Sequence, residues 1–229
     1  MIPGTFHVDG ALPPPALALT DVQAPTGSTS FSGVNFGPED STRFMVLCVT
    51  TSWLDNSHGA LTSATIGGVS AGGPLSAGYP GAFCNTCIFG AAVPSGTTGS
   101  ISLGGSTSHF YELSFSIYSI RFLRSTTPFD ARNFNASAAG NSSVSINVPV
   151  NGVLIASNST QNPSSFGTPG FSGVTRDYVT KWNQQITFPN YNFAHESGSL
   201  TTATALSDHG VASTNVSSSA NGLAAVSFG

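Results

Sequence analysis

The stretch TRFMVLCVTTSW, residues 42–53, decides the fold class of this chain. Its apolar run from Phe44 to Val49 is unbroken, and the β-branched pair Thr50 and Thr51 follows directly. A short continuous apolar run that is rich in β-branched residues is typical of a strand with two buried faces. We therefore expect a β-strand here that is covered on both sides.

Two neighbouring segments carry turn signals between short apolar runs. In LTSATIGGVSA, residues 61–71, two runs meet at Gly67-Gly68, which predicts a hairpin. In SVSINVPVNGVLIAS, residues 143–157, the pair Asn151-Gly152 lies between two apolar runs. An Asn-Gly pair in that position is the strongest short-range hairpin signal, so a second hairpin is expected there.

A further segment, YELSFSIYSIRFL at residues 111–123, alternates between apolar and polar residues. The alternation predicts a strand, and its loss after Tyr118 predicts a β-bulge at that point. No segment has the pattern of an amphipathic helix of three turns. Strands separated by Gly, Pro, Asn and Ser turns every 8–15 residues or so predict an all-β protein, a β-sandwich or jelly-roll-like fold of about ten strands.

The order of the segments also suggests how the chain is divided. Residues 1–30 are expected to form a Pro-rich extended arm, because Pro13-Pro14-Pro15 favours a polyproline path, with Ala16–Val22 as an edge strand. Residues 31–229 are expected to form a single β-sandwich domain with a long loop at 125–142. A split into two domains at that loop is the alternative.

Composition excludes several classes of partner. Only 7% of the residues are charged, against roughly 25% in ordinary soluble domains, so the surface must be rich in Ser, Thr, Asn and Gly. Such a surface suits a protein that assembles with other subunits. The six basic residues are mostly scattered, which disfavours nucleic-acid binding. No apolar run is long enough for a membrane span, and the N-terminus lacks the features of a secretory signal peptide.

The segment FCNTCIF, residues 83–89, places Cys84 and Cys87 in a C-x-x-C spacing. A zinc site needs two more ligands, and Cys48 is the only other cysteine, within an expected buried strand. Redox catalysis needs the pair at a helix N-terminus, whereas Ile88 and Phe89 continue as strand. We interpret the three cysteines as packed thiols, with a structural disulfide as the alternative. No metal and no cofactor is expected.

Catalytic motifs are not evident, and the nearest approach to a binding surface is aromatic. The pattern G-x-S-x-G is absent, and the five histidines are separated by long polar stretches. Asp177 and Glu196 lie near several aromatic residues, an arrangement that a glycan-binding face would use. The candidate glycan-facing aromatics are Trp53, Trp182, Tyr178 and Tyr191. The alternative is that these rings pack in the core of the sandwich.

The segments STRFMVLCVTTSW, LTSATIGGVSA, IFGAAVPSGTTGSISLGGS and YELSFSIYSI together resemble a pattern found in virion proteins of tailed bacteriophages and prophages. In those proteins a buried strand is followed by a T-I-G-G-V hairpin, a VP-x-G-T-T-G turn and an aromatic-rich strand. The resemblance covers roughly residues 40–229, it carries over no catalytic residue, and it does not explain the cysteine pair.

The resemblance implies a non-enzymatic virion structural protein that decorates the head or forms part of the collar or tail fibre apparatus. Such a protein assembles in the host cytoplasm with copies of itself, for example as a trimer, and with other virion proteins. A carbohydrate- or receptor-binding module that recognises the host surface is a second hypothesis. A glycan-degrading sandwich enzyme is a third, and it requires two carboxylates facing one cleft.

Overall fold

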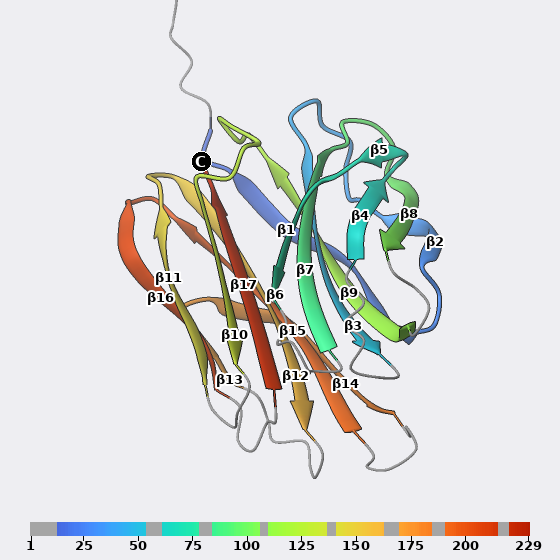
Figure 1. Ribbon diagram of the computed structural model, residues 1–229. Coiled ribbons are helices and arrows are strands. Elements are labelled where there is room, and N and C mark those ends of the chain that lie inside the picture. The colour runs from blue at the N-terminus through green and yellow to red at the C-terminus, as the bar shows by residue number, and fades with distance from the viewer. Residues whose placement is uncertain are drawn as a thin grey trace, which may run out of the picture.

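The computed structural model describes residues 13–53, 61–77, 84–105, 110–136, 141–162, 170–184, 191–214 and 220–229. These ranges contain seventeen β-strands in four sheets, and none of their residues is helical (Figure 1). The all-β expectation is therefore confirmed. The estimate of about ten strands is too low, because the chain holds more sheets than a single sandwich has.

The first half of the chain forms two sheets, which we call inner sheet 1 and outer sheet 1. Inner sheet 1 has the order β1-β9-β3-β7-β6, and outer sheet 1 has the order β2-β8-β4-β5. The strands are β1 (Ala16–Thr26), β2 (Ser30–Asn35), β3 (Phe44–Trp53), β4 (Leu61–Ile66), β5 (Val69–Ser70), β6 (Gly72–Ala77), β7 (Cys84–Ala92), β8 (Thr98–Gly105) and β9 (Phe110–Arg121).

The second half forms inner sheet 2, with the order β10-β17-β12-β15-β14, and outer sheet 2, with the order β11-β16-β13. The strands are β10 (Asp130–Ala136), β11 (Ser142–Val148), β12 (Gly152–Asn162), β13 (Gly170–Ser172), β14 (Thr175–Gln184), β15 (Tyr191–Thr202), β16 (Leu206–Thr214) and β17 (Ala220–Phe228).

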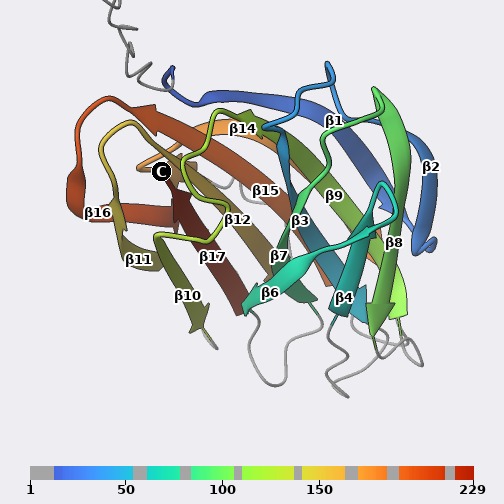
Figure 2. The same ribbon diagram turned by 90° about the horizontal axis from the view of Figure 1, so that it is seen from above.

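The four sheets stack as layers, with the two inner sheets face to face (Figure 2). One apolar cluster, which includes Leu47 and Phe115, lies between outer sheet 1 and inner sheet 1. A second cluster, with Val46 and Ile155, joins the inner sheets, and a third, with Leu154 and Val211, lies between inner sheet 2 and outer sheet 2. Every residue of β3 is buried, so the expectation of a strand covered on both faces is confirmed.

The two halves have the same topology. The strand order β1-β9-β3-β7-β6 of inner sheet 1 corresponds, strand by strand, to the order β10-β17-β12-β15-β14 of inner sheet 2. Corresponding strands also follow one another in the same order along the chain. The outer sheets match in the same way, through β2-β8-β4 and β11-β16-β13. This alternation of strands between two sheets is that of a jelly roll. The chain is therefore two jelly rolls in tandem, packed through their inner sheets.

A β-bulge fixes which residues of the two rolls are equivalent. In β6, two residues separate Gly72 from Leu75, while their partners on β7, Gly90 and Ile88, are separated by one. In β14, two residues separate Thr175 from Tyr178, and their partners on β15 are again separated by one. Leu75 and Tyr178 therefore occupy the same position in the two rolls.

The same equivalence extends across both inner sheets. Each sheet has a row of paired residues that ends just before its bulge. The row in inner sheet 1 is Leu19, Tyr118, Val46, Gly90 and Gly72, and the row in inner sheet 2 is Ala131, Val226, Ile155, Ser199 and Thr175. In the stack, β1 contacts β14, β3 contacts β12 and β6 contacts β10. An approximate two-fold rotation, with its axis near β3 and β12, thus relates the rolls.

Several local expectations can now be compared with the structure. The Gly67-Gly68 hairpin is confirmed by the pairing of β4 with β5. The turn at Asn151-Gly152 exists, but β11 and β12 on either side of it belong to different sheets, so the hairpin expectation is wrong. The bulge expected after Tyr118 is wrong, because β9 pairs with β3 in unbroken register there. The irregularity lies in the neighbouring strand β1, between Leu19 and Asp21.

The expected loop at 125–142 is wrong in part, because β10 lies within it. The described side chains at 131–135 are all exposed, so this edge strand carries no apolar face that the sequence could reveal. Ala16–Val22 lies within β1 at the edge of inner sheet 1, as expected, and residues 1–12 of the arm lie outside the described residues. The sheets change from the first pair to the second between Arg121 and Asp130, where the alternative of a split was placed.

Candidate functional site

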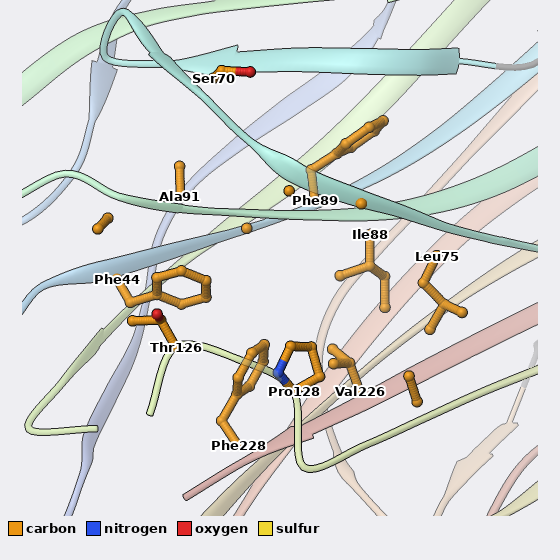
Figure 3. Close-up of a pocket in the computed structure, with 15 residues that line it drawn as sticks. Phe44, Ser70, Leu75, Ile88, Phe89, Ala91, Thr126, Pro128, Val226 and Phe228 are labelled. Carbon is orange, nitrogen blue, oxygen red and sulfur yellow. The ribbon is translucent and has the colours of Figure 1, made fainter. Parts of the chain in front are cut away.

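A pocket of about 350 Å³ opens at one edge of the interface between the inner sheets, and we call it the junction pocket. Its walls come from β6 and β7 on one side, and from β10, β17 and the segment before β10 on the other (Figure 3). The larger apolar side chains that line it include Phe44, Leu75, Ile88, Val226 and Phe228. Among the described lining residues, Ser70 and Thr126 provide the polar side chains and none is charged.

Glycine residues keep the β6–β7 wall open. Gly73 has a φ of 112°, which other residues rarely adopt, and it lies in the bulge of β6. A Cβ atom added to Gly90 would come within 2.6 Å of the Phe44 ring. The opposite wall is lined in part by Ala131 of β10, whose side chain is small. The shape of the pocket therefore depends on several residues that have little or no side chain.

The equivalent edge of the interface is closed. There Tyr178 of β14 donates a hydrogen bond from its hydroxyl to the Gln23 carbonyl oxygen of β1, at 3.2 Å. Its ring contacts the His195 ring edge-on, with centroids 5.5 Å apart. Leu19, the equivalent of Ala131, packs against the cluster between the inner sheets. At the closed edge, Leu19 takes the place of Ala131 and Tyr178 takes the place of Leu75. Both side chains are larger than their counterparts at the junction pocket.

A cluster of hydroxyl groups around His195 continues the interface between the inner sheets. The Nδ1 atom of His195 lies 3.1 Å from Ser114 Oγ, and its Nε2 atom lies 3.4 Å from Ser157 Oγ. Thr86 Oγ1 is hydrogen-bonded to Ser157 Oγ at 2.6 Å. Ser114 and Ser157 come from different inner sheets, so the imidazole ring joins the two rolls.

Burial determines what this cluster can do. His195, Ser114, Ser157 and Thr86 have no exposed surface, and none of them lines either described pocket. Burial lowers the pKa of His195 to about 3, so the ring is neutral and can donate from one nitrogen and accept at the other. A serine–histidine pair of this kind has the atoms of a nucleophilic site without access for a substrate. Its evident role is to satisfy polar groups between the sheets.

A second polar cluster lies on the other face of inner sheet 2, around the fully buried Glu196. Its carboxylate accepts hydrogen bonds from Asn158 Nδ2 and Ser213 Oγ, both at 3.3 Å, and lies 3.4 Å from Arg176 Nη1. Burial raises the pKa of Glu196, while Arg176 and the two hydrogen bonds oppose that rise. Asp177 and Glu196 are the carboxylates that the sequence placed near the candidate glycan-facing aromatics, but Glu196 has no exposed surface with which to contact a ligand.

The aromatic residues expected to face a glycan are placed differently from that expectation. Trp53 and Trp182 are only 2% and 7% exposed, so neither presents a ring to solvent, and this part of the expectation is wrong. Trp182 donates a hydrogen bond from Nε1 to Ser52 Oγ at 3.2 Å and stacks on Phe193. Tyr178 closes the interface edge described above, and the half-buried Tyr191 packs beside Phe193. These rings serve packing, the alternative stated for them.

The three cysteines are free and buried. Cys84 faces inner sheet 2 beside Trp182, Cys48 lies in the cluster between the inner sheets, and Cys87 faces outer sheet 1. Because residues three apart in a strand point to opposite faces, Cys84 and Cys87 cannot form a disulfide. Burial raises the pKa of both thiols to about 12 and also raises that of Cys48. This placement is the one that the packed-thiol interpretation expects.

The described residues contain no group of three His, Cys, Asp or Glu side chains that could hold a metal ion. Nor do they contain a helix long and apolar enough to cross a membrane.

A groove of about 370 Å³ between β1 and β2 is lined by Asp21, Gln23, Phe31 and several serines. It is the more polar of the two described pockets, and it has one carboxylate.

Comparison with known proteins adds no relative: no protein-family model, no curated protein and no solved structure matches this chain.

The junction pocket was not expected from the sequence. The pair Gly72-Gly73 inside a strand was its best available signal, because glycine in a strand often marks a bulge or a close approach.

Proposed function

We propose that this protein is a non-enzymatic structural subunit of a virion, of a tailed phage or a phage-like particle, and that it acts by assembly. It buries surface against copies of itself and against other virion proteins. The observation that carries this proposal is the junction pocket, an uncharged apolar recess that opens on the surface between the two rolls.

The surroundings of the pocket support an assembly role. Phe129 is 60% exposed and follows the lining residue Pro128, and Val69 is 39% exposed and precedes the lining residue Ser70. Exposed apolar residues that adjoin an apolar recess are typical of surfaces that contact another protein. The low charge of the chain is consistent with a protein that spends its life in contact with other subunits.

The architecture supports the virion setting by analogy alone. Jelly rolls are common in viral capsid proteins and also in lectins, so the fold narrows the function without deciding it. The resemblance of residues 40–229 to phage virion proteins favours the first of these classes. His195 and Glu196, at the centres of the two polar clusters, are fully buried, which favours a structural role over a catalytic one.

Mass spectrometry of phage-like particles purified from the source strain tests the proposal. We expect peptides of this chain at the abundance of a structural protein, in particles from which soluble cell proteins have been removed by density-gradient centrifugation. Localisation by cryo-electron microscopy would then assign head, collar or tail. If the particles lack the protein, or the strain yields no particles, the proposal is wrong.

The groove between β1 and β2 favours a second candidate function, recognition of a host-surface glycan. Its side chains combine a carboxylate with amide and hydroxyl groups, and Phe31 offers an aromatic ring. The Asp21 carboxylate is held by hydrogen bonds from the backbone N–H groups of Val22 at 2.8 Å and Asn35 at 2.7 Å. Fixed polar groups beside a ring are the components that a sugar-binding site requires.

Glycan-array binding compares the two candidates. A host-recognition module should bind a restricted set of glycans, and Asp21→Asn and Phe31→Ala should each reduce that binding at least tenfold. The substitution Asp208→Asn, in the opposite roll, serves as the control. An array without signal would count against glycan recognition and would leave the assembly proposal intact.

A further inference from the structure

We infer that the junction pocket receives the N-terminal segment of a neighbouring copy, residues 1–12, with the Phe6 ring seated between β6 and β10. This inference rests on the proposed assembly function and specifies the contact through which copies join. It follows from the internal symmetry of the molecule, from the chemistry of the pocket and from the length of chain outside the described residues.

The symmetry indicates the kind of group that fills the pocket. At the closed edge of the interface, the Tyr178 ring lies between β14 and β1. Leu75 is the equivalent of Tyr178, and Ala131 is the equivalent of Leu19, so the open edge has smaller side chains at both positions. The closed edge is filled by the aromatic ring of Tyr178, and the open edge has no ring at the equivalent position. We therefore expect an aromatic ring to be the group that fills the open edge.

The size and polarity of the pocket fit such a ring. Its volume of about 350 Å³ exceeds the roughly 150 Å³ of an apolar cavity that accommodates benzene. Figure 3 shows Phe44, Leu75, Ile88 and Phe228 around the space, with the Thr126 hydroxyl at its margin. A charged ligand would find no counter-ion among the described lining residues, whereas a phenyl ring would bury apolar surface at little desolvation cost.

Residues 1–12 contain one aromatic residue, Phe6, within the largely apolar run MIPGTF. The described chain begins at Pro13, and the exposed Pro13-Pro14 pair precedes β1. Ala16 is paired with Arg121, next to the pairing of Ile120 with the pocket residue Phe44. The described chain therefore begins at the end of the sheets on which Phe44 lies, and twelve residues could span at most about 40 Å.

A neighbouring copy, rather than the same one, is the source that the topology favours. β1 and β6 are the opposite edges of inner sheet 1. To enter the pocket of the same molecule, the chain before β1 would have to turn back across the sheet toward β6. Pro13, Pro14 and Pro15 favour an extended path and so disfavour such a turn. The pocket of another copy can be reached without that reversal. Both β6 and β10 lie at the edge of their sheets among the described strands, which is a position at which an incoming strand can be added.

Cross-linking between two singly substituted chains tests the inference directly. One full-length chain carries Phe6→Cys and the other carries Ala131→Cys, and the two are co-expressed and oxidised. Because each chain has one of the new thiols, an inter-chain disulfide requires docking between copies. We expect a cross-linked dimer that is at least tenfold more abundant than with Val22→Cys in place of Ala131→Cys.

A second measurement uses a synthetic peptide of residues 1–12 with the intact full-length protein. Sedimentation should show self-association that the peptide inhibits, and the Phe6→Ala peptide should be at least tenfold weaker. Leu75→Tyr, which copies the closed edge, should weaken self-association at least tenfold, while Val179→Tyr on an exposed site should not. Circular dichroism and thermal unfolding confirm that both variants fold.

The outcomes separate this inference from the proposed function. If the protein is abundant in particles but neither the cross-link nor peptide inhibition occurs, the arm contact is wrong and the virion role stands. If both occur but particles lack the protein, the contact stands and the virion role is wrong. Self-association that persists unchanged in Leu75→Tyr, or equal inhibition by the wild-type and Phe6→Ala peptides, overturns docking between copies.

Discussion

Leu75 and Tyr178 stand at the same point of two jelly rolls, each immediately after the same β-bulge in an edge strand. Tyr178 closes its edge of the interface between the rolls, whereas Leu75 leaves the equivalent edge open as a pocket. A fold with internal two-fold symmetry has thus acquired one closed and one open edge. The difference lies in few side chains, so substitution can test it.

The first prediction concerns the closed edge. Tyr178→Leu removes the hydrogen bond to the Gln23 carbonyl and the contact with the His195 ring. We expect the free energy of unfolding to fall by about 2 kcal/mol, because a half-buried ring and one hydrogen bond are lost. Urea denaturation followed by fluorescence measures the change. Tyr178→Phe keeps the ring and should cost about 1 kcal/mol, and an equal loss in both variants would contradict the role of the ring.

The second prediction concerns Arg43, which is 1% exposed and lies just before β3. Its guanidinium donates hydrogen bonds to backbone carbonyl oxygens of two loops, including those of Pro38 at 2.9 Å, Val93 at 2.7 Å and Gly96 at 2.6 Å. Arg43→Met would remove this donor from one buried carbonyl, that of Val93, and from partly buried carbonyls of both loops. We expect a loss of about 3–5 kcal/mol in urea denaturation.

The geometry around Arg43 also predicts what will not restore stability. A lysine has a single ammonium group and cannot reach carbonyls on both loops, so Arg43→Lys should recover less than half of the loss. Arg124→Met, at an exposed position, is the matched control and should change stability by less than about 0.5 kcal/mol. A stable Arg43→Met protein would show that the loops hold their shape without this side chain.

Arg43 illustrates what sequence patterns can and cannot reveal. The run from Phe44 to Val49 predicts its buried strand because periodicity and apolar character act locally. Arg43 precedes that run as one of few scattered basic residues, and only the tertiary structure places loop carbonyls around it. β10 escaped prediction for the opposite reason, since its exposed side chains follow no burial pattern.

The duplication and the pocket were hidden for a related reason. Equivalent strands in the two rolls share their pairing scheme, but equivalent positions hold different residues, such as Leu75 and Tyr178. Non-local pairing cannot be inferred from turn signals alone: the Asn151-Gly152 turn leads β11 into one sheet and β12 into another. The cysteines were predictable because a lone C-x-x-C without further ligands or a helix has few roles.

The third prediction concerns those cysteines. Their burial and raised pKa values make Cys48, Cys84 and Cys87 poor nucleophiles in the folded protein. We expect no reaction with a thiol reagent under native conditions, and three thiols to react after denaturation without reductant. Fewer than three after denaturation would indicate a disulfide. Rapid labelling of the native protein would mean that the interface between the rolls opens readily.

The fourth prediction concerns the pH dependence of stability through His195. Burial lowers its pKa to about 3, whereas an unfolded histidine has a pKa of about 6.5. The unfolded chain therefore binds a proton first as the pH falls, which stabilises the unfolded state. The contribution of neutral His195 is fully present above about pH 6.5 and is lost progressively toward pH 3. Between pH 7 and pH 5 the loss should be about 2 kcal/mol.

The variant His195→Asn, which lacks this imidazole, isolates the effect from other titrations. Glu196 acts with the opposite sign, because its raised pKa means that stability is lost as the pH rises through its titration range. That contribution is common to the wild type and to His195→Asn, so it cancels when their unfolding free energies are subtracted. The difference should change by about 2 kcal/mol between pH 7 and pH 5. A difference independent of pH would mean that His195 titrates normally in the folded protein, and hence that water reaches the interface between the two rolls.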